Sequence, residues 1–389
     1  VYAGQARYSL RVRNNDFDEE NLAKGIAYAH ALGKKFYVVV NIQAHNAKLD
    51  TFIRDITPVV QMQPDALIMS DPGLIMLVRE HFPQQAIHLS VQANAVNWAT
   101  VKFWQNMGIS RVILSRELSV KEIAQIHAQV PDIELEVFVH GALCMAYSGR
   151  CLLSGYINRR DANQGTCTNA CRWEFKTHGA RTCSAGDVHL LEEPQKRAGE
   201  YMPIEEDEHG TYILNSKDLR AIEYVERLAQ IGVDSLKIEG RTKSLYYVAR
   251  TAQAYRRAID DAVAGRPFNP ALITDLEGLA NRGYTTGLLD RRPANDYQNY
   301  ETGHSVAHRS QFVGEVRAAA DGWVEVETKN RFAVGDTIEI IHPSGNRQVR
   351  VQQMQNTDGH AIEVASGNPV QVWIPVEGPA EGALIARML

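Results

Sequence analysis

The sequence predicts an α/β fold in which a TIM-like (β/α)8 barrel is followed by a small antiparallel β-barrel. More than half of the chain alternates short β-branched stretches with longer amphipathic ones, the pattern of repeated strand–helix units. Most of the short stretches are continuously apolar, which is typical of strands buried on both faces. After residue 311 the pattern changes to an alternation with period two, which is typical of antiparallel strands.

Seven stretches between residues 1 and 244 have the composition of parallel strands. In chain order they are VYAG, KFYVVVNI, DALIMSD, IHLSVQA, RVILSRE, LEVFVHG and SLKIEGR. The segments between them have helical periodicity, as in NLAKGIAYAHALG, VNWATVKFWQNMG and SVKEIAQIHAQV. We expect the first two of these helices to end at Gly33 and Gly108 in left-handed conformation. The third should begin with a capping box formed by Ser119 and Glu122.

Seven strands of this kind are one fewer than a closed parallel barrel requires. The sequence begins inside the first of them, so we expect one strand and one helix to precede Val1. A doubly wound sheet is the alternative architecture. It is not supported by the sequence, because the G-x-G-x-x-G pattern of dinucleotide-binding sheets is absent.

Polar residues follow the predicted strands, at the end where barrel enzymes place their active sites. They are Gln5, Asn41, Ser70, Asp71, Ser90, Gln92, Asn94, Ser115, Arg116, Glu117, His140, Lys237, Glu239 and Arg241. A single polar residue at such a position can be explained as a helix cap or a loop contact without a functional role. Polar residues after seven strands predict a functional site on this rim.

The rest of the chain completes the predicted organisation. Residues 1–290 form the TIM-like domain and include long helices near residues 245–264 and 272–280. Residues 175–210 are expected to be an irregular insertion of unassigned fold. Residues 291–310 are polar and aperiodic like a linker, and residues 311–389 form the small β-barrel, punctuated by the turn sequences DG, GD and SGN.

Composition and charge exclude some classes of protein. The formal net charge of −5 argues against a chain that binds nucleic acid through its overall charge, although arginines cluster locally. No apolar stretch approaches the roughly 20 residues of a membrane-spanning helix, so we expect no membrane association. Five cysteines, four of them in one region, do not resemble the framework of a secreted protein, and we expect a reducing, cytoplasmic location.

The segment 143–173 contains Cys144, Cys151, Cys167 and Cys171, with the spacing C-x6-C-x15-C-x3-C. On helices, residues seven apart and residues four apart share a face, so two pairs of thiolates can meet in one site. Such a site suits Zn2+ or an iron–sulfur cluster, and the absence of tight C-x2-C pairs favours the cluster. Disulfides and uncoordinated thiols are the remaining alternatives. Cys183 is either a spare thiol or a ligand in place of Cys171.

The stretch EVFVHGALCMAYSGRCLLS, residues 136–154, resembles the signature of the family named peptidase U32. The blocks HLSVQANAVN, VILSREL, NSKDL, LKIEGR and NRGYTTG also resemble that family, and the likeness covers essentially the whole chain. YSLRVRNN and GTCTNACRW are similar to the branch that makes 5-hydroxyuridine at the wobble position of tRNA, position 34.

The resemblance implies an enzyme that hydroxylates without O2, with prephenate as the hydroxyl donor. It also implies a 4Fe-4S cluster bound by four cysteines, which on this chain are Cys144, Cys151, Cys167 and Cys171, with Cys183 as the alternative to the last. The partner is the tRNA anticodon loop, whose wobble base is already single-stranded and can enter a pocket without melting of a duplex. Accessory proteins for cluster assembly are expected as further partners.

The two carboxylates of prephenate require cations at the mouth of the barrel. We expect Arg116 and Arg241 to bind them, because a guanidinium group matches a carboxylate in two hydrogen bonds. Lys237 is the third candidate charge. The structural alternative is that these cations form salt bridges with Glu117 or Glu239.

The remaining candidate site residues surround these cations. His140 and Glu239 are the candidate catalytic residues, with His140 able to shuttle a proton or only to form a hydrogen bond near the cluster. Gln92 and Asn94 are candidate substrate-binding residues. Tyr147 is a candidate stacking partner for the base, with packing as its alternative role.

Three other functions are weighed against this one. A sister hydroxylase would act on ribosomal-RNA cytidine or in ubiquinone synthesis. A protease would use a nucleophile such as Cys144 beside His140, but four clustered thiols fit metal binding better, and the H-E-x-x-H, G-x-S-x-G and P-loop motifs are absent. A non-catalytic RNA-binding module would not need a polar rim on every strand.

Overall fold

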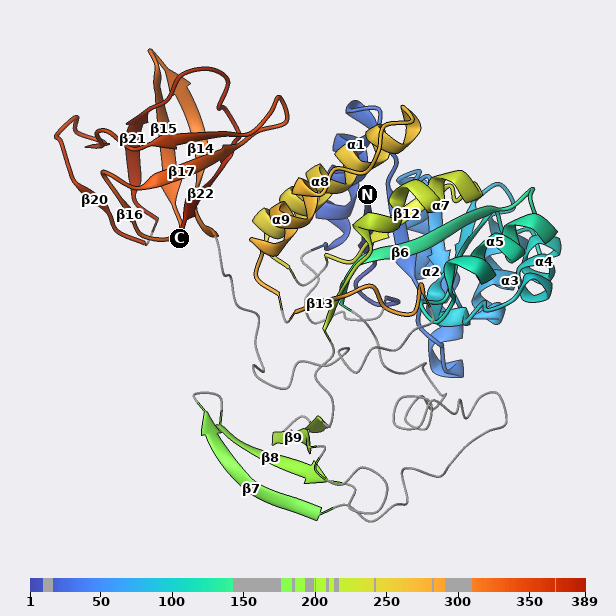
Figure 1. Cartoon of the computed structure of the whole chain (residues 1–389). Coiled ribbons are helices and arrows are strands. Elements are labelled where there is room, and N and C mark those ends of the chain that lie inside the picture. The colour runs from blue at the N-terminus through green and yellow to red at the C-terminus, as the bar shows by residue number, and fades with distance from the viewer. Residues whose placement is uncertain are drawn as a thin grey trace. The chain divides into compact units, whose positions relative to one another are not determined.

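The computed structural model describes residues 1–9, 17–142, 176–183, 186–192, 199, 201–207, 210–212, 217–240, 243–281, 283–290, 310–367 and 369–389. The chain divides into two compact units (Figure 1). The first comprises Val1–Thr242 and Gly283–Gly303, and the second comprises Lys243–Arg282 and His304–Leu389. The long helix after residue 243 therefore groups with the C-terminal strands, whereas the sequence pattern assigned it to the N-terminal domain.

Seven parallel strands form the core of the first unit, and each matches one of the seven stretches predicted to be strands. They are β1 (Tyr2–Gly4), β2 (Tyr37–Val40), β3 (Ala66–Met69), β4 (Ile87–Leu89), β5 (Arg111–Ile113), β6 (Glu134–Ala142) and β12 (Ser235–Ile238), of which β6 extends one residue beyond the predicted LEVFVHG stretch at each end. Each strand pairs in parallel with the next in this order. Two strands absent from the prediction extend the sheet: β11 (Asp218–Arg220) pairs antiparallel with the end of β6 and parallel with β13 (Tyr284–Thr285).

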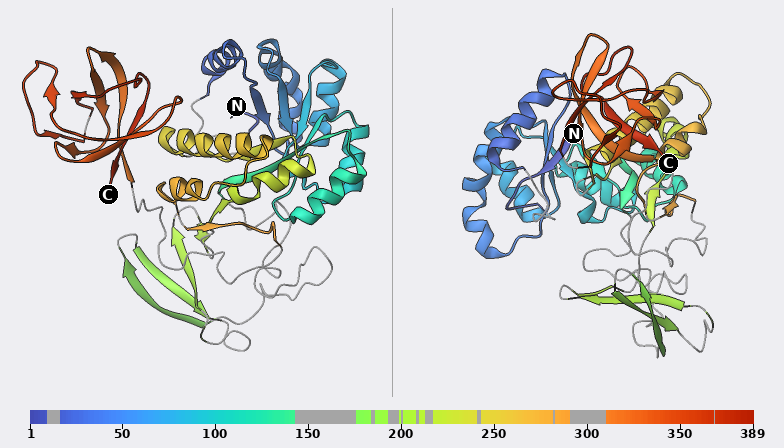
Figure 2. Two further views of the ribbon diagram at one scale, coloured as in Figure 1. Left: turned by 45° about the horizontal axis from the view of Figure 1, so that its top comes forward. Right: turned by 90° about the vertical axis from the view of Figure 1, so that its left-hand side faces the viewer.

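Helices connect these strands and lie on the outside of the sheet (Figure 2). Their apolar residues recur every three or four positions, so that in α2 one stripe (Phe52, Ile56 and Val59) is fully buried. Gly33 and Gly108 have positive φ angles of 65° and 79°, as predicted. The helices are α1 (Glu19–Ala31), α2 (Asn46–Gln61), α3 (Pro72–His81), α4 (Trp98–Asn106), α5 (Val120–Gln129) and α7 (Val225–Ile231), with the 3-10 turns η2 (Val91–Ala93) and η5 (Ile222–Tyr224). The predicted capping box at the start of α5 is present.

The parallel sheet curves until side chains of its first strand reach its last parallel strand. The Tyr2 hydroxyl on β1 lies 3.4 Å from the backbone oxygen of Ile238 on β12. No backbone pairing joins β1 to β12 among the described strands. The α/β class with a parallel sheet is therefore confirmed, and closure into an eight-stranded TIM barrel stays a prediction.

The described residues of the insertion at 175–210 form regular strands, so the expectation of an irregular segment is wrong there. β7 (Lys176–Cys183), β8 (Gly186–Glu192), β9 (Tyr201–Asp207) and β10 (Gly210–Tyr212) form a four-stranded antiparallel sheet of successive neighbours. The strands are polar and rich in charge, as in KTHGARTC. They therefore lack the apolar alternation by which strands are recognised in a sequence.

The second unit combines two helices with a curled antiparallel sheet, in agreement with the predicted strands after residue 311. The helices are α8 (Leu245–Val263) and α9 (Ala271–Glu277). Seven strands form the sheet in the order β18-β17-β22-β14-β15-β21-β19, and β16 pairs separately with β20. The strands are β14 (Ser310–Ala320), β15 (Trp323–Thr328), β16 (Phe332–Ala333), β17 (Thr337–Ile341), β18 (Arg347–Arg350), β19 (Gln355–Asn356), β20 (Val364–Ala365), β21 (Gln371–Pro375) and β22 (Leu384–Met388).

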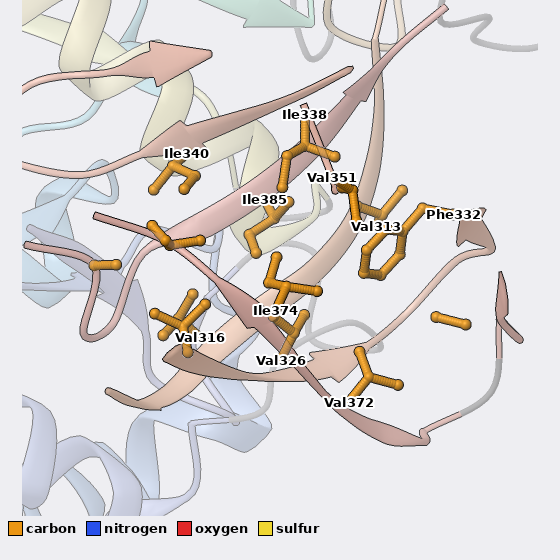
Figure 3. Close-up of a cluster of buried hydrophobic side chains, with 14 of the residues drawn as sticks. Val313, Val316, Val326, Phe332, Ile338, Ile340, Val351, Val372, Ile374 and Ile385 are labelled. Carbon is orange, nitrogen blue, oxygen red and sulfur yellow. The ribbon is translucent and has the colours of Figure 1, made fainter. Parts of the chain in front are cut away.

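The inner face of this sheet packs into a hydrophobic core of mostly aliphatic side chains that also contains Phe332 (Figure 3). In β15, Val324, Val326 and Thr328 are buried and the residues between them are partly exposed, which is the predicted period of two. α8 packs on the same unit: the ring of Tyr246 stacks on that of Phe312 with 5.2 Å between centroids. No helix in the described part of the chain is long and apolar enough to cross a membrane.

Candidate active site at the strand ends

The predicted catalytic residues His140 and Glu239 meet where β6 and β12 end. His140 is fully buried on β6, and the amide of Glu239, the first residue after β12, donates to the His140 backbone oxygen at 2.9 Å. The two strands pair in parallel along Glu136–His140, with a register shift just before Ile238. Two residues that are 99 positions apart in the sequence are thus adjacent in the folded sheet.

Gly141 makes this close approach possible. Its φ angle is +108°, a conformation that side chains rarely adopt. A Cβ atom at this position would overlap the backbone oxygen of Glu239 and would lie 2.7 Å from the Glu239 Cβ atom. The glycine of the EVFVHGALC stretch is therefore required by backbone geometry at the site.

A cluster of buried charges lies on β5, β6 and β12, four residues before His140 along β6. The Lys237 ammonium donates to Glu136 Oε1 at 2.6 Å, and Ser235 Oγ and Arg111 Nη1 donate to Glu136 Oε2 at 2.9 and 3.3 Å. Burial alone would raise the pKa of Glu136, but the attraction of Lys237 and the hydrogen bonds outweigh it and the pKa is lowered. Glu136 is therefore a carboxylate in a fully paired network. Arg111 also contacts Glu134, whose side chain is 48% exposed.

Lys237 was predicted to offer a free charge to the substrate. Its ammonium is instead paired with Glu136, and it lies 4.2 Å from the ring centroid of Tyr2. Among the described residues, neither Lys237 nor Arg116 forms the alternative salt bridge to Glu117 or Glu239. The carboxylate that pairs with Lys237 is that of Glu136. A substrate-binding role for Lys237 stays a prediction.

Arg116 differs from the other cations of this region. Its guanidinium carbon lies 3.7 Å from the ring centroid of Phe138, an arrangement typical of cation–π stacking. Its Nε atom is buried and has no hydrogen-bond partner in the described part of the chain, where Arg116 also makes no salt bridge. The enclosed space beside it has a volume of about 10 Å3, room for about one water molecule.

Gln92 and Asn94 lie on the short turn after β4. The Asn94 side chain donates to the Gln92 backbone oxygen at 3.2 Å, and Asn94 has a left-handed backbone (φ 54°). Ser90 begins this turn and accepts from the Asn41 side chain at 3.1 Å, so the ends of β2 and β4 are joined. Both predicted substrate-binding side chains are half-buried on the predicted rim.

Some site features were missed from the sequence. A shallow hollow of about 520 Å3 lies at the ends of β2 and β3, lined by Gln43, His45, Asn46 and Asp71 among others. Tyr284 on β13 contacts the His140 ring at 5.5 Å and lies under the Arg220 guanidinium at 5.2 Å. Tyr284 belongs to the block NRGYTTG, which could have marked it as a site residue. Nothing in that block indicates that Tyr284 contacts His140 and Arg220.

The predicted metal ligands cannot be placed in the fold. Cys144, Cys151, Cys167, Cys171, Arg241 and Tyr147 lie outside the described residues, and only the backbone of Cys183, on β7, is described. β6 ends at Ala142, two residues before the first of these thiols. The described residues contain no group of three potential metal ligands. The donor set itself, four thiols, is chemically suited to iron–sulfur or zinc.

The chain is similar to known proteins along its whole length. The family model Peptidase family U32 matches residues 1–299, and the model Peptidase family U32 C-terminal domain matches residues 308–387. A protein of Escherichia coli named tRNA hydroxylation protein P is 63% identical, covering 97% of this chain and 88% of that protein. The protein of the same name from Haemophilus influenzae is 58% identical with the same coverage. A 23S rRNA 5-hydroxycytidine synthase of E. coli is 28% identical, covering 98% of this chain and 54% of that protein.

Proposed function

This chain belongs to peptidase family U32, and from that membership we propose that it is a tRNA-hydroxylating enzyme. The observation that carries the proposal is the 63% identity, over 97% of the chain, to a protein named for tRNA hydroxylation. Identity to the rRNA synthase is only 28%, which favours tRNA over rRNA as the substrate. The sister hydroxylases and a protease are the alternatives that the experiments below test.

We further propose that the product is 5-hydroxyuridine at wobble position 34, formed without O2 and with prephenate as the hydroxyl donor. Arg116 supports the binding of a dicarboxylate. Its guanidinium group is at a strand end and lacks a carboxylate partner among the described residues, whereas Arg111 and Lys237 are both paired. A guanidinium held against the Phe138 ring and without a carboxylate partner among the described residues could donate two hydrogen bonds to a substrate carboxylate.

His140 and Glu239 are the proposed catalytic residues. Hydroxylation at C5 replaces a hydrogen of the base, and an imidazole or a carboxylate beside the reacting carbon can accept the proton. The backbone bond between Glu239 and His140 holds both residues at the same end of the sheet. Gln92 and Asn94, on the turn after β4, are proposed to contact the substrate. Arg241 is proposed as a second carboxylate-binding cation.

A 4Fe-4S cluster is proposed to be held by Cys144, Cys151, Cys167 and Cys171, with Cys183 as the alternative fourth ligand and zinc as the alternative metal. Converting C–H to C–OH is a two-electron oxidation, whose oxidant would be the hydroxyl donor prephenate. A cluster bound by these cysteines could relay electrons between the donor and the base, which redox-inactive zinc could not. Cluster-assembly proteins are the proposed accessory partners, and the proposed location is the cytoplasm.

Nucleoside analysis of a deletion strain tests the proposed function. Cells are grown without O2, because the proposed reaction does not use it, and nucleosides of tRNA and rRNA are quantified by mass spectrometry. We expect 5-hydroxyuridine and its derivatives to disappear from tRNA, with rRNA unchanged, and to return with the wild-type gene. Loss of a modified rRNA cytidine instead would identify a sister hydroxylase. Unchanged tRNA and rRNA would contradict both hydroxylase functions.

The same strain tests the cysteines. Cys144→Ala should fail to restore tRNA hydroxylation, and the variant purified without O2 should lose its iron. Cys171→Ala and Cys183→Ala are compared to identify the fourth ligand. Only the variant that has lost a cluster ligand should lose iron. If the wild-type protein contains stoichiometric zinc and shows no broad visible absorbance band, the assignment of an iron–sulfur cluster is wrong.

A further inference from the structure

The hydroxyl of Tyr2 connects the first strand of the sheet to the end of the last parallel strand. Tyr2 Oη lies 3.2 Å from Glu239 Oε2 and 3.4 Å from the Ile238 backbone oxygen. A phenol hydroxyl donates one hydrogen bond, and the carboxylate oxygen is the stronger acceptor because it carries charge. The proposed catalytic carboxylate thus receives a neutral donor from β1.

The ring of Tyr2 is held in turn by the buried ion pair. The Lys237 ammonium lies 4.2 Å from the ring centroid and is fixed by Glu136 at 2.6 Å. Glu136 and Lys237 are only 3% and 8% exposed, and Arg111 and Ser235 further restrain the carboxylate. A cation fixed in this way restricts the ring that faces it, because the attraction depends on the ammonium lying over the ring.

We propose that Tyr2 is a positioning residue that fixes the Glu239 carboxylate at the rim, and that the Glu136–Lys237 pair holds Tyr2 in place. The inference rests on the proposed function for the role of Glu239. Glu239 lies just beyond a strand and is partly exposed, and a glutamate side chain has three torsion angles that must be fixed to place its carboxylate. A hydroxyl on a buried strand restrains them before the substrate arrives, which lowers the entropic cost of reaching the reactive geometry.

Tyr2→Phe tests the positioning role, with Tyr37→Phe as its matched control. The change at Tyr2 removes the hydroxyl and keeps the ring under Lys237. Tyr37 is the register partner of Tyr2 on β2, and its ring lies 5.4 Å from the guanidinium carbon of the buried Arg111, as the Tyr2 ring lies under Lys237. The Tyr37 hydroxyl accepts from Arg111 at 3.4 Å instead of contacting Glu239. Both variants therefore lose one hydroxyl at the same level of the sheet.

The single-turnover rate of tRNA hydroxylation is measured at saturating prephenate, together with the prephenate KM. We expect Tyr2→Phe to lower the rate about tenfold or more with little change in KM, because the carboxylate is misplaced and the substrate is still bound. Tyr37→Phe should stay within about twofold of the wild-type rate. Equal losses in both variants, or a change in KM alone for Tyr2→Phe, would overturn the proposal.

A double-mutant cycle tests the contact without using activity. Urea unfolding is compared for Tyr2→Phe, Glu239→Ala and the double variant. Because both changes remove the same hydrogen bond, the double variant should be more stable than the sum of the single effects predicts. Additive effects would overturn the proposed coupling. This readout stands even if the wild-type protein does not hydroxylate tRNA, so failure of the function and failure of the inference are distinguishable.

Discussion

At the scale of single residues, the fold pairs charges that are far apart in the sequence. Lys237 lies next to the last residue of the short strand β12, a position at which a cation is expected to face a substrate. Its ammonium instead lies 2.6 Å from the Glu136 carboxylate, and both side chains are almost completely buried. Each charge stabilises the fold only while the other is present, because an unpaired buried charge keeps the cost of its desolvation.

Glu136→Gln should therefore be strongly destabilising, by about 3–5 kcal/mol, because it leaves the Lys237 ammonium without a counter-charge. The double variant Glu136→Gln/Lys237→Met should recover much of the loss, since it removes both charges and keeps the side-chain volume. Glu134→Gln is the control: its side chain is 48% exposed, so removing its charge should cost less than about 1 kcal/mol. Urea unfolding measures all three, and an equal loss for Glu134→Gln and Glu136→Gln would contradict the account.

At the scale of elements, β6 organises the candidate site. It is nine residues long and pairs with β5 near its start, with β12 along its middle and with β11 at its end. His140 is the residue of β6 that is in register with both neighbours, with Arg220 of β11 and with Ile238 of β12. Most of β6 is visible in the sequence as the stretch LEVFVHG, but its three partner strands are not, because strand pairing depends on residues up to about a hundred positions away.

Gly141→Ala should disturb this junction, because the added Cβ would overlap the Glu239 backbone oxygen in a conformation with φ of +108°. We expect a loss of about 2 kcal/mol or more in the free energy of unfolding, together with loss of activity. Gly33→Ala isolates the conformational part of this cost, since Gly33 has a φ of +65° and open space around its Cβ position. It should cost only about 1 kcal/mol. Similar losses for both variants would show that the close approach to Glu239 is unimportant.

At the scale of the whole molecule, each compact unit has its own buried polar contacts. In the second unit, Arg250 of α8 contacts Asp275 of α9 and Glu339 of β17, each at 3.0 Å. These ion pairs tie the helices to the C-terminal sheet. In the first unit, His88 is packed against Tyr37 at 4.8 Å, and burial lowers the pKa of His88 to about 4.

The two units should consequently respond differently to mild acid. The pKa of His88 is lowered from 6.5 to about 4, so between these pH values the imidazole is protonated in the unfolded state and neutral in the folded state. The free energy of unfolding therefore decreases as the pH falls through this range. The first unit should lose about 1 kcal/mol between pH 7.5 and 5.5. In the second unit, Arg317 lowers the pKa of Glu327 to about 2, which affects stability only below about pH 4.5. Calorimetry at several pH values measures both transitions, and His88→Gln should flatten the first. A pH-independent first transition in the wild-type protein would contradict this role of His88.

Local periodicity and contiguous motifs were enough to predict the seven parallel strands, the helix caps, the antiparallel C-terminal strands and the likeness to peptidase family U32. The four clustered cysteines are also visible in the sequence, and their assignment to an iron–sulfur cluster stays a prediction. The pairing of Lys237 with Glu136, the stacking of Arg116 on Phe138 and the contact of Tyr2 with Glu239 emerge only in the folded chain. The same is true of the packing of α8 and α9 with the C-terminal sheet. Such contacts join residues distant in the chain, and their energies depend on burial and register, which no local stretch of sequence specifies.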